Sequence, residues 1–402
     1  MRSELPPILC LGFPAWEGDY QKSTVQLMRA LAATQRVLYV EYPFSWKDVW
    51  QGWRGAAKPY RRVLGLEARL RAMPVAGTGS LHVLTLPPVL PINGLSPGGL
   101  YEALAKANAR RVLPAIRQAL RQLGYARPLL INAFNPFLGV YLHGQLDVTA
   151  TYYYCYDQIG AARWTHRHGP RLEARLLRQI DGLVATSQPL LDAKDAPQAT
   201  LVPNGVDLAL FEQAFAELPD RSGPPVLGYL GSIDDRVDTG LLLRLLACWP
   251  EARLLMVGRI THPEIAARLE AHPRIELAGA RQPAELPAWV RQMHIGLIPF
   301  VDNAFTRYIY PLKINEYLAA GLPVVCTPFG DLGDFRGIAH VAAGDAFVDA
   351  CRQVWLDDSP ARRIARRDFA RTHSWEARAA QLLTWLADPT REKSRVSQPI
   401  LS

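Results

Sequence analysis

Short apolar runs alternate with longer helical stretches along nearly all of the 402 residues, and this alternation limits the fold most strongly. The runs are continuous rather than apolar at every second position, which is typical of strands covered by helices on both faces. Repeated strand–helix units of this kind predict the α/β class, with doubly wound parallel sheets. We expect strands at residues 8–13, 37–41, 82–86, 129–133, 149–156, 182–186, 200–203, 225–230, 253–257, 275–277, 295–299, 323–326 and 340–342.

The chain is longer than one hydrophobic core usually organises, so we expect two domains. A cluster of turn residues from Pro203 to Asp207 marks their boundary. Two α/β domains in tandem predict a ligand-binding cleft between the carboxyl ends of their sheets. We expect a first Rossmann-like domain at residues 1–205 and a second one at residues 206–371. A helix at about residues 372–388 is expected to pack back on the first domain, and residues 389–402 to form a flexible tail.

Charge is unevenly distributed, which points to different partners for the two halves. Residues 1–205 carry 23 Lys and Arg against 13 Asp and Glu, whereas residues 206–402 carry 22 against 24. Hydrophobic residues make up 49% and charged residues 20% of the chain, which rules out global disorder. No apolar run reaches the length of a membrane span. Five scattered cysteines without a CxxC motif indicate reduced thiols, and therefore a cytoplasmic protein.

The stretch from Tyr310 to Cys326 predicts a short helix that runs directly into a buried strand. Pro311 suits the first helical position and Gly321 the C-terminal cap. Pro323 then prevents the helix from continuing.

Lys313 and Glu316 are three positions apart and therefore share one face of this helix. Lys313 lies in the first turn, where a cation is unfavourable for the helix dipole, and a bound anion such as a pyrophosphate would relieve the conflict. Glu316 can accept hydrogen bonds from ribose or sugar hydroxyl groups. The alternative is a solvated ion pair on an ordinary helix, which the spacing alone favours.

Two expected strands of the second domain end in glycine, at Gly231-Ser232 and Gly258-Arg259. Glycine lets the backbone approach a diphosphate closely, and Arg259 or Arg236 can add a charge-assisted contact. Because glycine after a strand is common in α/β folds, each of these signals is weak by itself.

An aromatic run in the first domain ends at Asp157, which places this carboxylate at the carboxyl end of a strand. A carboxylate on the rim of the cleft can take a proton from a substrate hydroxyl group. Capping the next helix is an equally good interpretation of Asp157.

Residues 315–325, Asn-Glu-Tyr-Leu-Ala-Ala-Gly-Leu-Pro-Val-Val, resemble the signature helix of GT-B glycosyltransferases, whose C-terminal domain binds a nucleotide-sugar. The similarity covers most of residues 200–388. Four further motifs stand in the order expected of this family, at residues 202–207, 228–232, 255–259 and 373–376. The resemblance implies a GT-B architecture, in which two Rossmann-like domains face a cleft.

What the resemblance implies for function is a metal-independent transferase of the hexosyltransferase type. Such an enzyme moves a sugar from a nucleotide-diphosphate sugar to a hydroxyl group of a glycan or lipid-linked acceptor, in cell-surface or exopolysaccharide synthesis. We expect no cofactor and no metal site, since Asp234-Asp235 is not a DxD motif. Lys313 is expected to stabilise the charge on the leaving diphosphate. The donor is expected to contact Gly231, Ser232, Arg236, Arg259, Tyr310, Lys313 and Glu316.

Within the family, the helix resembles a subgroup that reads PLK–x–x–E–Y–L–A–A–G and includes teichuronic-acid-type and xanthan-type enzymes. The xanthan-type enzymes use an Asp after the corresponding strand as their base, which implies this role for Asp157 and favours inversion. Many retaining members have a Glu eight positions before the helix Glu, where this chain has Tyr308. Retention is therefore not assumed.

The first strand–helix loop of the first domain is expected to line the acceptor side of the cleft, through Gly12, Trp16 and Tyr20. A well-packed turn is the equal alternative for this loop.

Residues 46–71 combine tryptophans with basic residues, the mixture that binds membrane surfaces. They predict a peripheral contact with the inner face of the cell membrane. The alternative is a solvated helical insertion whose tryptophans are buried. No nucleic-acid-binding module accompanies these residues, so no nucleic acid is expected as a partner.

Two other functions remain open at this point. A nucleotide-sugar 2-epimerase has the same two-domain architecture, but it should show several acids in its cleft. A non-catalytic nucleotide- or glycan-binding protein of this fold is the third possibility, and the absence of a Glu at position 308 keeps it open.

Overall fold

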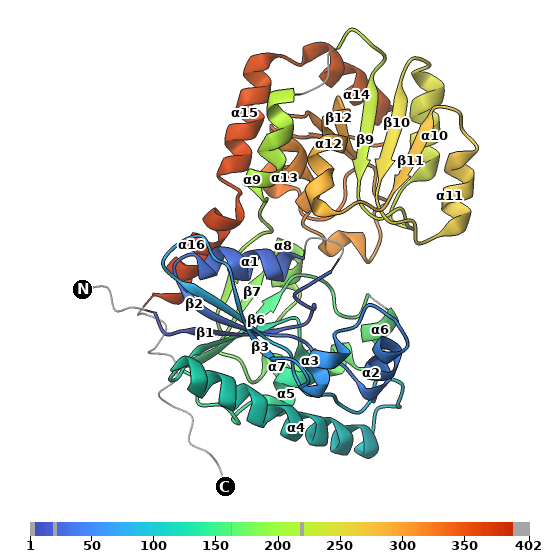
Figure 1. Cartoon of the computed structure of the whole chain (residues 1–402). Helices are drawn as coiled ribbons and strands as arrows, with labels where there is room; N and C mark the ends of the chain where they lie inside the picture. Colours follow the sequence, from blue (N-terminus) through green and yellow to red (C-terminus); the bar gives the residue numbers. More distant parts are fainter. Residues whose placement is uncertain (1–4, 19–21, 162, 218–220, 389–402) are drawn as a thin grey trace.

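The computed structural model describes residues 5–18, 22–161, 163–217 and 221–388. These residues form two α/β units, one above the other in Figure 1, and each unit is built on a single sheet. We call them the N-terminal unit and the C-terminal unit. The chain passes from the first sheet to the second between Leu201 and Val226, close to the predicted boundary at residues 205–206.

The N-terminal unit contains an eight-stranded sheet in the order β3-β4-β2-β1-β5-β6-β7-β8. All neighbouring strands are parallel except β3 and β4. The strands are β1 (Ile8–Gly12), β2 (Arg36–Val40), β3 (Leu70–Met73), β4 (Ser80–Leu84), β5 (Leu129–Ala133), β6 (Ala150–Cys155), β7 (Gly182–Ala185) and β8 (Ala199–Leu201). The helices are α1 (Ser23–Ala32), α2 (Trp46–Trp53), α3 (Tyr60–Leu64), α4 (Gly99–Leu123), α5 (Pro136–Leu142), α6 (Arg163–His166), α7 (Gly169–Leu177) and α8 (Gln188–Asp192).

The C-terminal unit contains a six-stranded parallel sheet in the order β11-β10-β9-β12-β13-β14. Its strands are β9 (Val226–Leu230), β10 (Arg253–Val257), β11 (Ile275–Gly279), β12 (Ile295–Ile298), β13 (Val324–Cys326) and β14 (His340–Val341). Its helices are α9 (Leu208–Phe211), α10 (Thr239–Cys248), α11 (Pro263–Glu270), α12 (Leu286–Val290), α13 (Leu312–Ala319), α14 (Asp345–Asp357) and α15 (Pro360–Arg371), and α16 (Trp375–Leu386) follows.

Both faces of the N-terminal sheet are covered, which explains why its strands are continuously apolar. In β1, Ile8 and Cys10 lie in one hydrophobic cluster, whereas Leu9 and Leu11 lie in another. Successive side chains of a strand point to opposite faces, so each face has its own core. The prediction of doubly wound α/β sheets is therefore confirmed.

Helix α16 follows the C-terminal unit in sequence but packs on the N-terminal unit. Its residues Trp375 and Leu382 belong to the same hydrophobic cluster as β1 and α1, and Figure 1 shows α16 beside α1. Where the chain returns, Val206 N donates to His373 O at 3.0 Å and Trp375 N donates to Val206 O at 3.2 Å. The two connections between the units therefore run side by side.

Two local features differ from the sequence-based expectations. Strand β3 was not predicted, because three of its residues are half-buried, Ala72 is exposed, and they carry no strong apolar pattern. It pairs antiparallel with β4 at the edge of the sheet. Pro311 immediately precedes α13 instead of being its first residue, and Gly321 follows the C-cap residue Ala320 with φ +76°.

Candidate functional site

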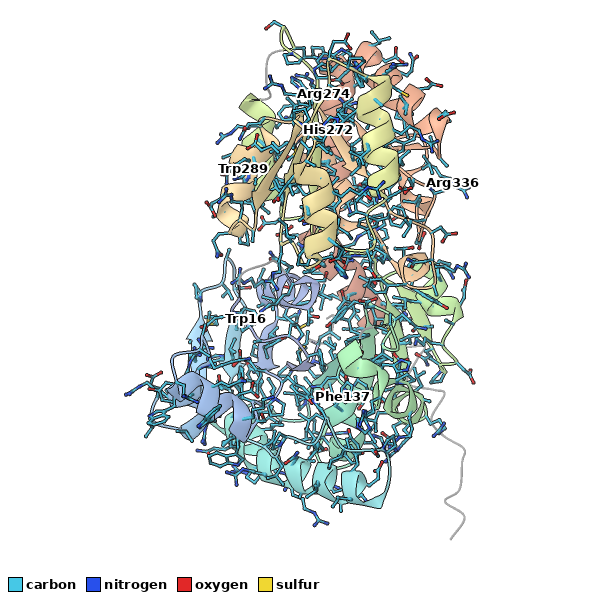
Figure 2. All side chains as sticks on the ribbon, turned by 90° about the vertical axis from the view of Figure 1, so that its right-hand side faces the viewer. Trp16, Phe137, His272, Arg274, Trp289 and Arg336 are labelled. Atoms are coloured by element: carbon cyan, nitrogen blue, oxygen red, sulfur yellow. The ribbon has the colours of Figure 1, made fainter. Side chains whose placement is uncertain are left out.

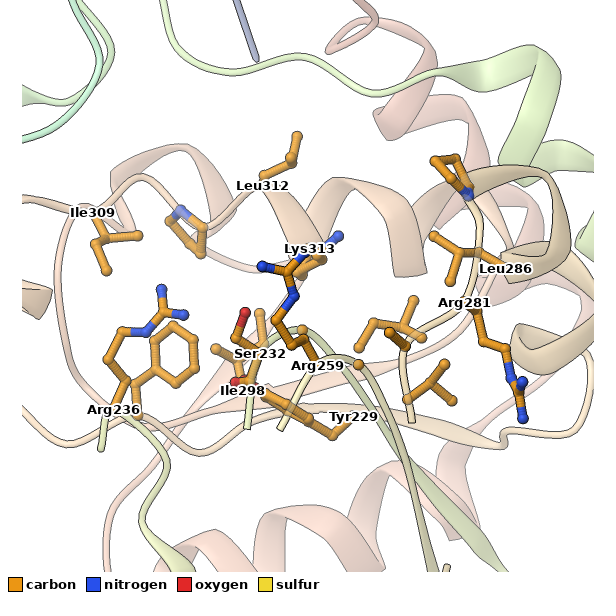
Figure 3. A pocket seen from close by; sticks show the side chains of 18 of the residues that line it. Tyr229, Ser232, Arg236, Arg259, Arg281, Leu286, Ile298, Ile309, Leu312 and Lys313 are labelled. Carbon is orange, nitrogen blue, oxygen red and sulfur yellow. The ribbon is translucent and has the colours of Figure 1, made fainter. Parts of the chain in front are cut away.

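A pocket of about 1010 Å³ opens at the carboxyl ends of β9, β10 and β12 in the C-terminal unit. Six of the seven residues predicted to bind a donor line it (Figure 3): Gly231, Ser232, Arg236, Arg259, Tyr310 and Lys313. The carboxyl ends of parallel strands are where ligands of open α/β sheets bind. We refer to this cavity as the cationic pocket.

Two glycine-containing loops form one side of the cationic pocket and lie against each other. Gly231 N donates to Val257 O at 3.0 Å. A Cβ atom on Gly258 would lie 1.7 Å from the carbonyl oxygen of Gly231. No side chain fits at position 258, so backbone alone forms this part of the wall.

Four cations from four different segments line the pocket: Arg236, Arg259, Arg281 and Lys313. The guanidinium of Arg281 lies 4.8 Å from the ring centroid of Trp289, and Figure 3 shows it directed away from Arg259 and Lys313. Figure 3 shows the side chains of Arg259 and Lys313 converging in the middle of the pocket. Arg281 was not predicted from the sequence, although a cation just after the end of β11 was a possible signal. A cavity lined by several cations favours an anionic ligand, which can form charge-assisted hydrogen bonds with them.

Arg236 is held firmly on the β9–α10 loop. Its Nε and Nη2 atoms donate to the two carboxylate oxygens of Asp234, at 2.8 and 2.6 Å. Its guanidinium also lies 5.4 Å from the ring centroid of Phe300. A bidentate pair and an aromatic neighbour fix the direction of the side chain, so Arg236 is pre-organised.

Lys313 and Glu316 form the ion pair that their spacing indicated, but only its lysine end is exposed to solvent. The Nζ atom of Lys313 lies 2.9 and 3.1 Å from the two carboxylate oxygens of Glu316. The Glu316 side chain is 1% exposed and that of Lys313 is 32% exposed. Burial raises the pKa of Glu316 and the Lys313 ammonium opposes this rise. Glu316 does not line the pocket, and it places Lys313 there.

Tyr310 contributes to the pocket wall, but its hydroxyl group is used elsewhere. It donates to Asp334 Oδ2 at 3.1 Å and accepts from Arg378 Nη2 at 3.2 Å. Arg378 belongs to α16, which packs on the N-terminal unit. The hydroxyl of Tyr310 thus links the pocket wall to the other unit.

Asp157 approaches the cationic pocket from the N-terminal unit, two residues after β6. It is not the cap of α6, which begins at Arg163. Burial raises the pKa of Asp157 to about 6, while a hydrogen bond from Gln158 N and the charge of Arg236 lower it. Asp157 is therefore within electrostatic reach of Arg236 on the opposite unit. A carboxyl group with this pKa suits proton transfer near neutral pH.

The three residues predicted for the acceptor side have different outcomes. Gly12 lines neither this pocket nor the next one, and a Cβ there would lie 2.1 Å from the hydroxyl oxygen of Tyr39. Trp16 lines a second pocket of about 550 Å³ that both units border. Figure 2 shows Trp16 near the junction of the units. Tyr20 lies outside the described residues.

Exposed tryptophans form one face of α2, which we call the tryptophan face: Trp46, Trp50 and Trp53, exposed by 44%, 54% and 72%. The alternative of an insertion with buried tryptophans is therefore wrong. Within the described ranges, no helix is both long and apolar enough to cross a bilayer. The same ranges hold no cluster of three or more His, Cys, Asp or Glu side chains suited to a metal ion.

Comparison with known proteins finds a family that resembles the C-terminal unit. Residues 224–357 match the family described as glycosyl transferases group 1. The cationic pocket is built from Tyr229 to Lys313, within this match. About a third of the chain, the part that holds this pocket, is thus similar to the group 1 glycosyl transferases.

Two curated relatives share sequence with this chain. It is 27% identical over 232 residues to the putative teichuronic acid biosynthesis glycosyltransferase TuaH of Bacillus subtilis, covering 53% of this chain and 58% of that protein. It is 27% identical over 213 residues to the lipopolysaccharide core biosynthesis mannosyltransferase LpsB of Rhizobium meliloti, covering 46% of this chain and 58% of that protein. The matches thus span little more than half of each relative's length.

Solved structures resemble the whole fold. Sucrose-phosphate synthase of Thermosynechococcus elongatus superimposes with a TM-score of 0.67 at 18% identity, over 95% of this chain and 98% of that one. The trehalose 6-phosphate synthase of Burkholderia multivorans gives 0.64 at 14% identity, over 97% and 100%. The fold is therefore that of the GT-B glycosyltransferases, as the sequence motifs predicted.

Proposed function

We propose that this protein is a cytoplasmic glycosyltransferase that acts without a metal ion or cofactor. It transfers a sugar from a nucleotide-diphosphate sugar to a hydroxyl group of a glycan or lipid-linked acceptor, in cell-surface or exopolysaccharide synthesis. The observation that carries the proposal is the cationic pocket, because it lies at the carboxyl edge of a parallel sheet inside the matched family domain. The two relatives, named as glycosyltransferases of teichuronic acid and lipopolysaccharide synthesis, support the same activity.

The donor diphosphate is expected beside Arg259 and Lys313. The loops at Gly231 and Gly258 pack against each other without side chains, so their backbone forms the wall that the diphosphate would approach. Glu316 is buried behind Lys313 and bonds it through both carboxylate oxygens, which directs the ammonium group into the pocket. The apolar wall at Pro283 and Leu286 suits the nucleoside.

Asp157 is proposed to be the base. It takes the proton of the acceptor hydroxyl as the oxygen attacks the anomeric carbon, and the bond from that carbon to the phosphate oxygen breaks. The electron pair of that bond leaves with the nucleoside diphosphate, whose new negative charge Arg259 and Lys313 stabilise. One base and direct displacement suffice for this reaction, so inversion at the anomeric carbon is expected.

The first experiment identifies the donor. A thermal-shift panel of UDP-, GDP-, dTDP- and CDP-sugars should raise the Tm for one nucleotide, because a ligand that binds only the native state stabilises it. The stabilising donor, labelled in its sugar, is then incubated with glycan and lipid-linked acceptors. NMR of the donor alone tests for an epimer, the product of a 2-epimerase.

The test of the base is Asp157→Asn, with Asp147→Asn as the matched control. Asp147 is an exposed carboxylate of the same unit, 82% exposed at its side chain. We expect Asp157→Asn to abolish transfer and to keep the donor-induced rise in Tm, whereas Asp147→Asn should behave like the wild type. Transfer at the wild-type rate in Asp157→Asn would contradict the assignment.

We also propose that the tryptophan face docks on an anionic membrane surface. Basic side chains accompany the exposed rings: Arg54 lies 4.6 Å from the Trp50 ring centroid and Arg111 of α4 lies 5.7 Å from that of Trp46. Exposed tryptophans enter the lipid interface while cations attract acidic headgroups. Figure 1 shows α2 on the part of the N-terminal unit remote from the C-terminal unit. A lipid-linked acceptor would then be presented to this unit.

Co-sedimentation with vesicles tests the docking. Phosphatidylcholine vesicles with phosphatidylglycerol should retain the protein at low salt, and pure phosphatidylcholine vesicles should not. The double variant Trp50→Ala/Trp53→Ala should lose most of the binding. Leu356→Ala, at a residue of α14 that is 74% exposed, is the matched control and should bind normally. Binding that does not depend on anionic lipid or on the tryptophans would refute the proposal.

A further inference from the structure

A buried ion pair lies behind the loop that carries Asp157. It joins Glu173 of α7 to Lys194, which follows α8, and each side chain is 6% exposed. The hydroxyl group of Tyr153 on β6 donates to Glu173 Oε1 at 2.8 Å. The Tyr153 bond ties the pair to β6, two residues before the strand reaches its carboxyl end at Cys155.

Lys194 also reaches the Asp157 loop directly. Its Nζ atom donates to Gln158 Oε1 at 3.1 Å. The backbone N–H of Gln158 in turn donates to Asp157 Oδ1 at 2.7 Å. On the other side, Cys155 Sγ donates to the carbonyl oxygen of Asp157 at 3.4 Å. A continuous chain of contacts therefore runs from the ion pair to the carboxylate of Asp157.

Burying such a pair costs free energy, because two charges lose their hydration. Good geometry between the charges and further hydrogen bonds are needed to offset this cost. A surface pair would give little stability and would not fix a loop. Here each charge has a second polar partner, Tyr153 for Glu173 and Gln158 for Lys194. The contact with Gln158 leads towards the carboxylate of Asp157, while Cys155 Sγ, 3.9 Å from Glu173 Oε1, contacts the Asp157 carbonyl group.

We propose that the Glu173–Lys194 pair is a positioning device for Asp157. Lys194 holds the side chain of Gln158, so the backbone N–H of Gln158 stays directed at the Asp157 carboxylate. This hydrogen bond keeps the carboxylate at the rim of the cleft, facing Arg236. This inference rests on the proposed function, in which Asp157 is the base. Lys194 and Gln158 are positioning residues and do not touch the substrate.

The pair acts on the ionisation of Asp157 through the Gln158 hydrogen bond. The titratable and charged groups around Asp157 are Arg236 on the β9–α10 loop, Cys155 on its own strand, and the Glu173–Lys194 pair with Tyr153 behind its loop. The Gln158 N–H favours the charged carboxylate, so weakening it raises the pKa of Asp157 above its value of about 6. The acidic limb of the rate profile then moves to higher pH.

Two variants of the full chain test the inference. Gln158→Leu removes the acceptor of Lys194 and leaves the ion pair intact, whereas Lys194→Met removes the pair itself. The matched control is Arg366→Met, which breaks the pair of Arg366 with Asp358 in the C-terminal unit, whose side chains are 7% and 4% exposed. The control reports what the loss of a buried pair does by itself.

The first readout needs no activity. The carboxyl carbon of Asp157 is titrated by NMR of aspartate-labelled protein, and its signal is assigned by its loss in Asp157→Asn. We expect a midpoint near 6 in the wild type. The midpoint should rise by about one pH unit in Gln158→Leu and Lys194→Met and should not move in Arg366→Met.

The second readout is the pH dependence of kcat/KM for transfer, whose acidic limb should shift in parallel while KM for the donor stays the same. An unmoved Asp157 midpoint in folded Gln158→Leu and Lys194→Met overturns the inference, as does an equal shift in Arg366→Met. If the wild type transfers no sugar but the midpoint moves as expected, the proposed function fails and the positioning of Asp157 stands.

Discussion

Replacing Lys313 by Met should destabilise the C-terminal unit strongly. Glu316 is 1% exposed at its side chain, and both of its carboxylate oxygens are bonded to Lys313. Removing one partner of a buried pair usually costs about 3–5 kcal/mol. Because the Lys313 side chain is 32% exposed, we expect the low end of this range, about 3 kcal/mol. The corresponding fall in Tm is roughly 6–12 °C for a unit of this size.

The loss should depend on pH in a defined direction. Burial holds the pKa of Glu316 above its usual value in the folded protein, and removing Lys313 raises it further. A carboxyl group with a raised folded-state pKa binds a proton more tightly in the native state, so its contribution to stability falls as pH rises through that pKa. The deficit of Lys313→Met is therefore largest at neutral pH and shrinks as pH falls towards the unfolded value of about 4.3.

Thermal unfolding of the wild type and Lys313→Met, measured between pH 5 and pH 8, tests this reasoning. The control is the double variant Lys313→Met/Glu316→Gln, in which the amide removes the unpaired buried charge. It should recover part of the lost Tm at pH 8 and less at pH 5. A deficit in Lys313→Met that is the same at both pH values, or a double variant that recovers nothing, would refute the electrostatic account.

Three further outcomes follow from the site. Gly258→Ala places a Cβ 1.7 Å from the Gly231 carbonyl oxygen. This variant should lower the free energy of unfolding by about 1–3 kcal/mol and abolish the nucleotide-induced rise in Tm. Normal nucleotide binding would contradict this expectation. Tyr317→Phe removes the hydroxyl group that accepts a hydrogen bond from the buried Leu230 N at 2.6 Å. Urea unfolding should show a free energy of unfolding lower by about 1–3 kcal/mol. An unchanged unfolding midpoint would contradict this expectation. Asp157 acts as a base only when it is ionised, and its pKa is about 6. The value of kcat/KM should therefore fall about tenfold per pH unit below pH 6. A flat profile between pH 4 and 7 would exclude Asp157 as the base.

The fold class could be predicted from the sequence, because strands buried on both faces consist of consecutive apolar residues. In β1, residues of both faces are apolar, Ile8 and Cys10 on one side and Leu9 and Leu11 on the other. Covered parallel strands therefore stand out as continuous runs. Strand β3 has no such signature, because it lies at the edge with half-buried residues, and only its pairing with β4 defines it.

The site could be predicted only in part, because the burial and proximity of its side chains depend on how distant segments pack together. The spacing of Lys313 and Glu316 predicted their contact, but nothing local indicated that Glu316 would be buried. Arg281 belongs to no motif, so its place in the pocket follows from the fold alone. The proximity of Asp157 to Arg236 likewise depends on how two separate sheets face each other.

The bond between Tyr310 and Arg378 constrains how the two units can move. Tyr310 sits in the pocket wall, whereas Arg378 projects from a helix anchored in the opposite core. A rotation of one unit against the other must either break this bond or pull the wall along with it. The width of the cavity and the angle between the units are thus mechanically coupled.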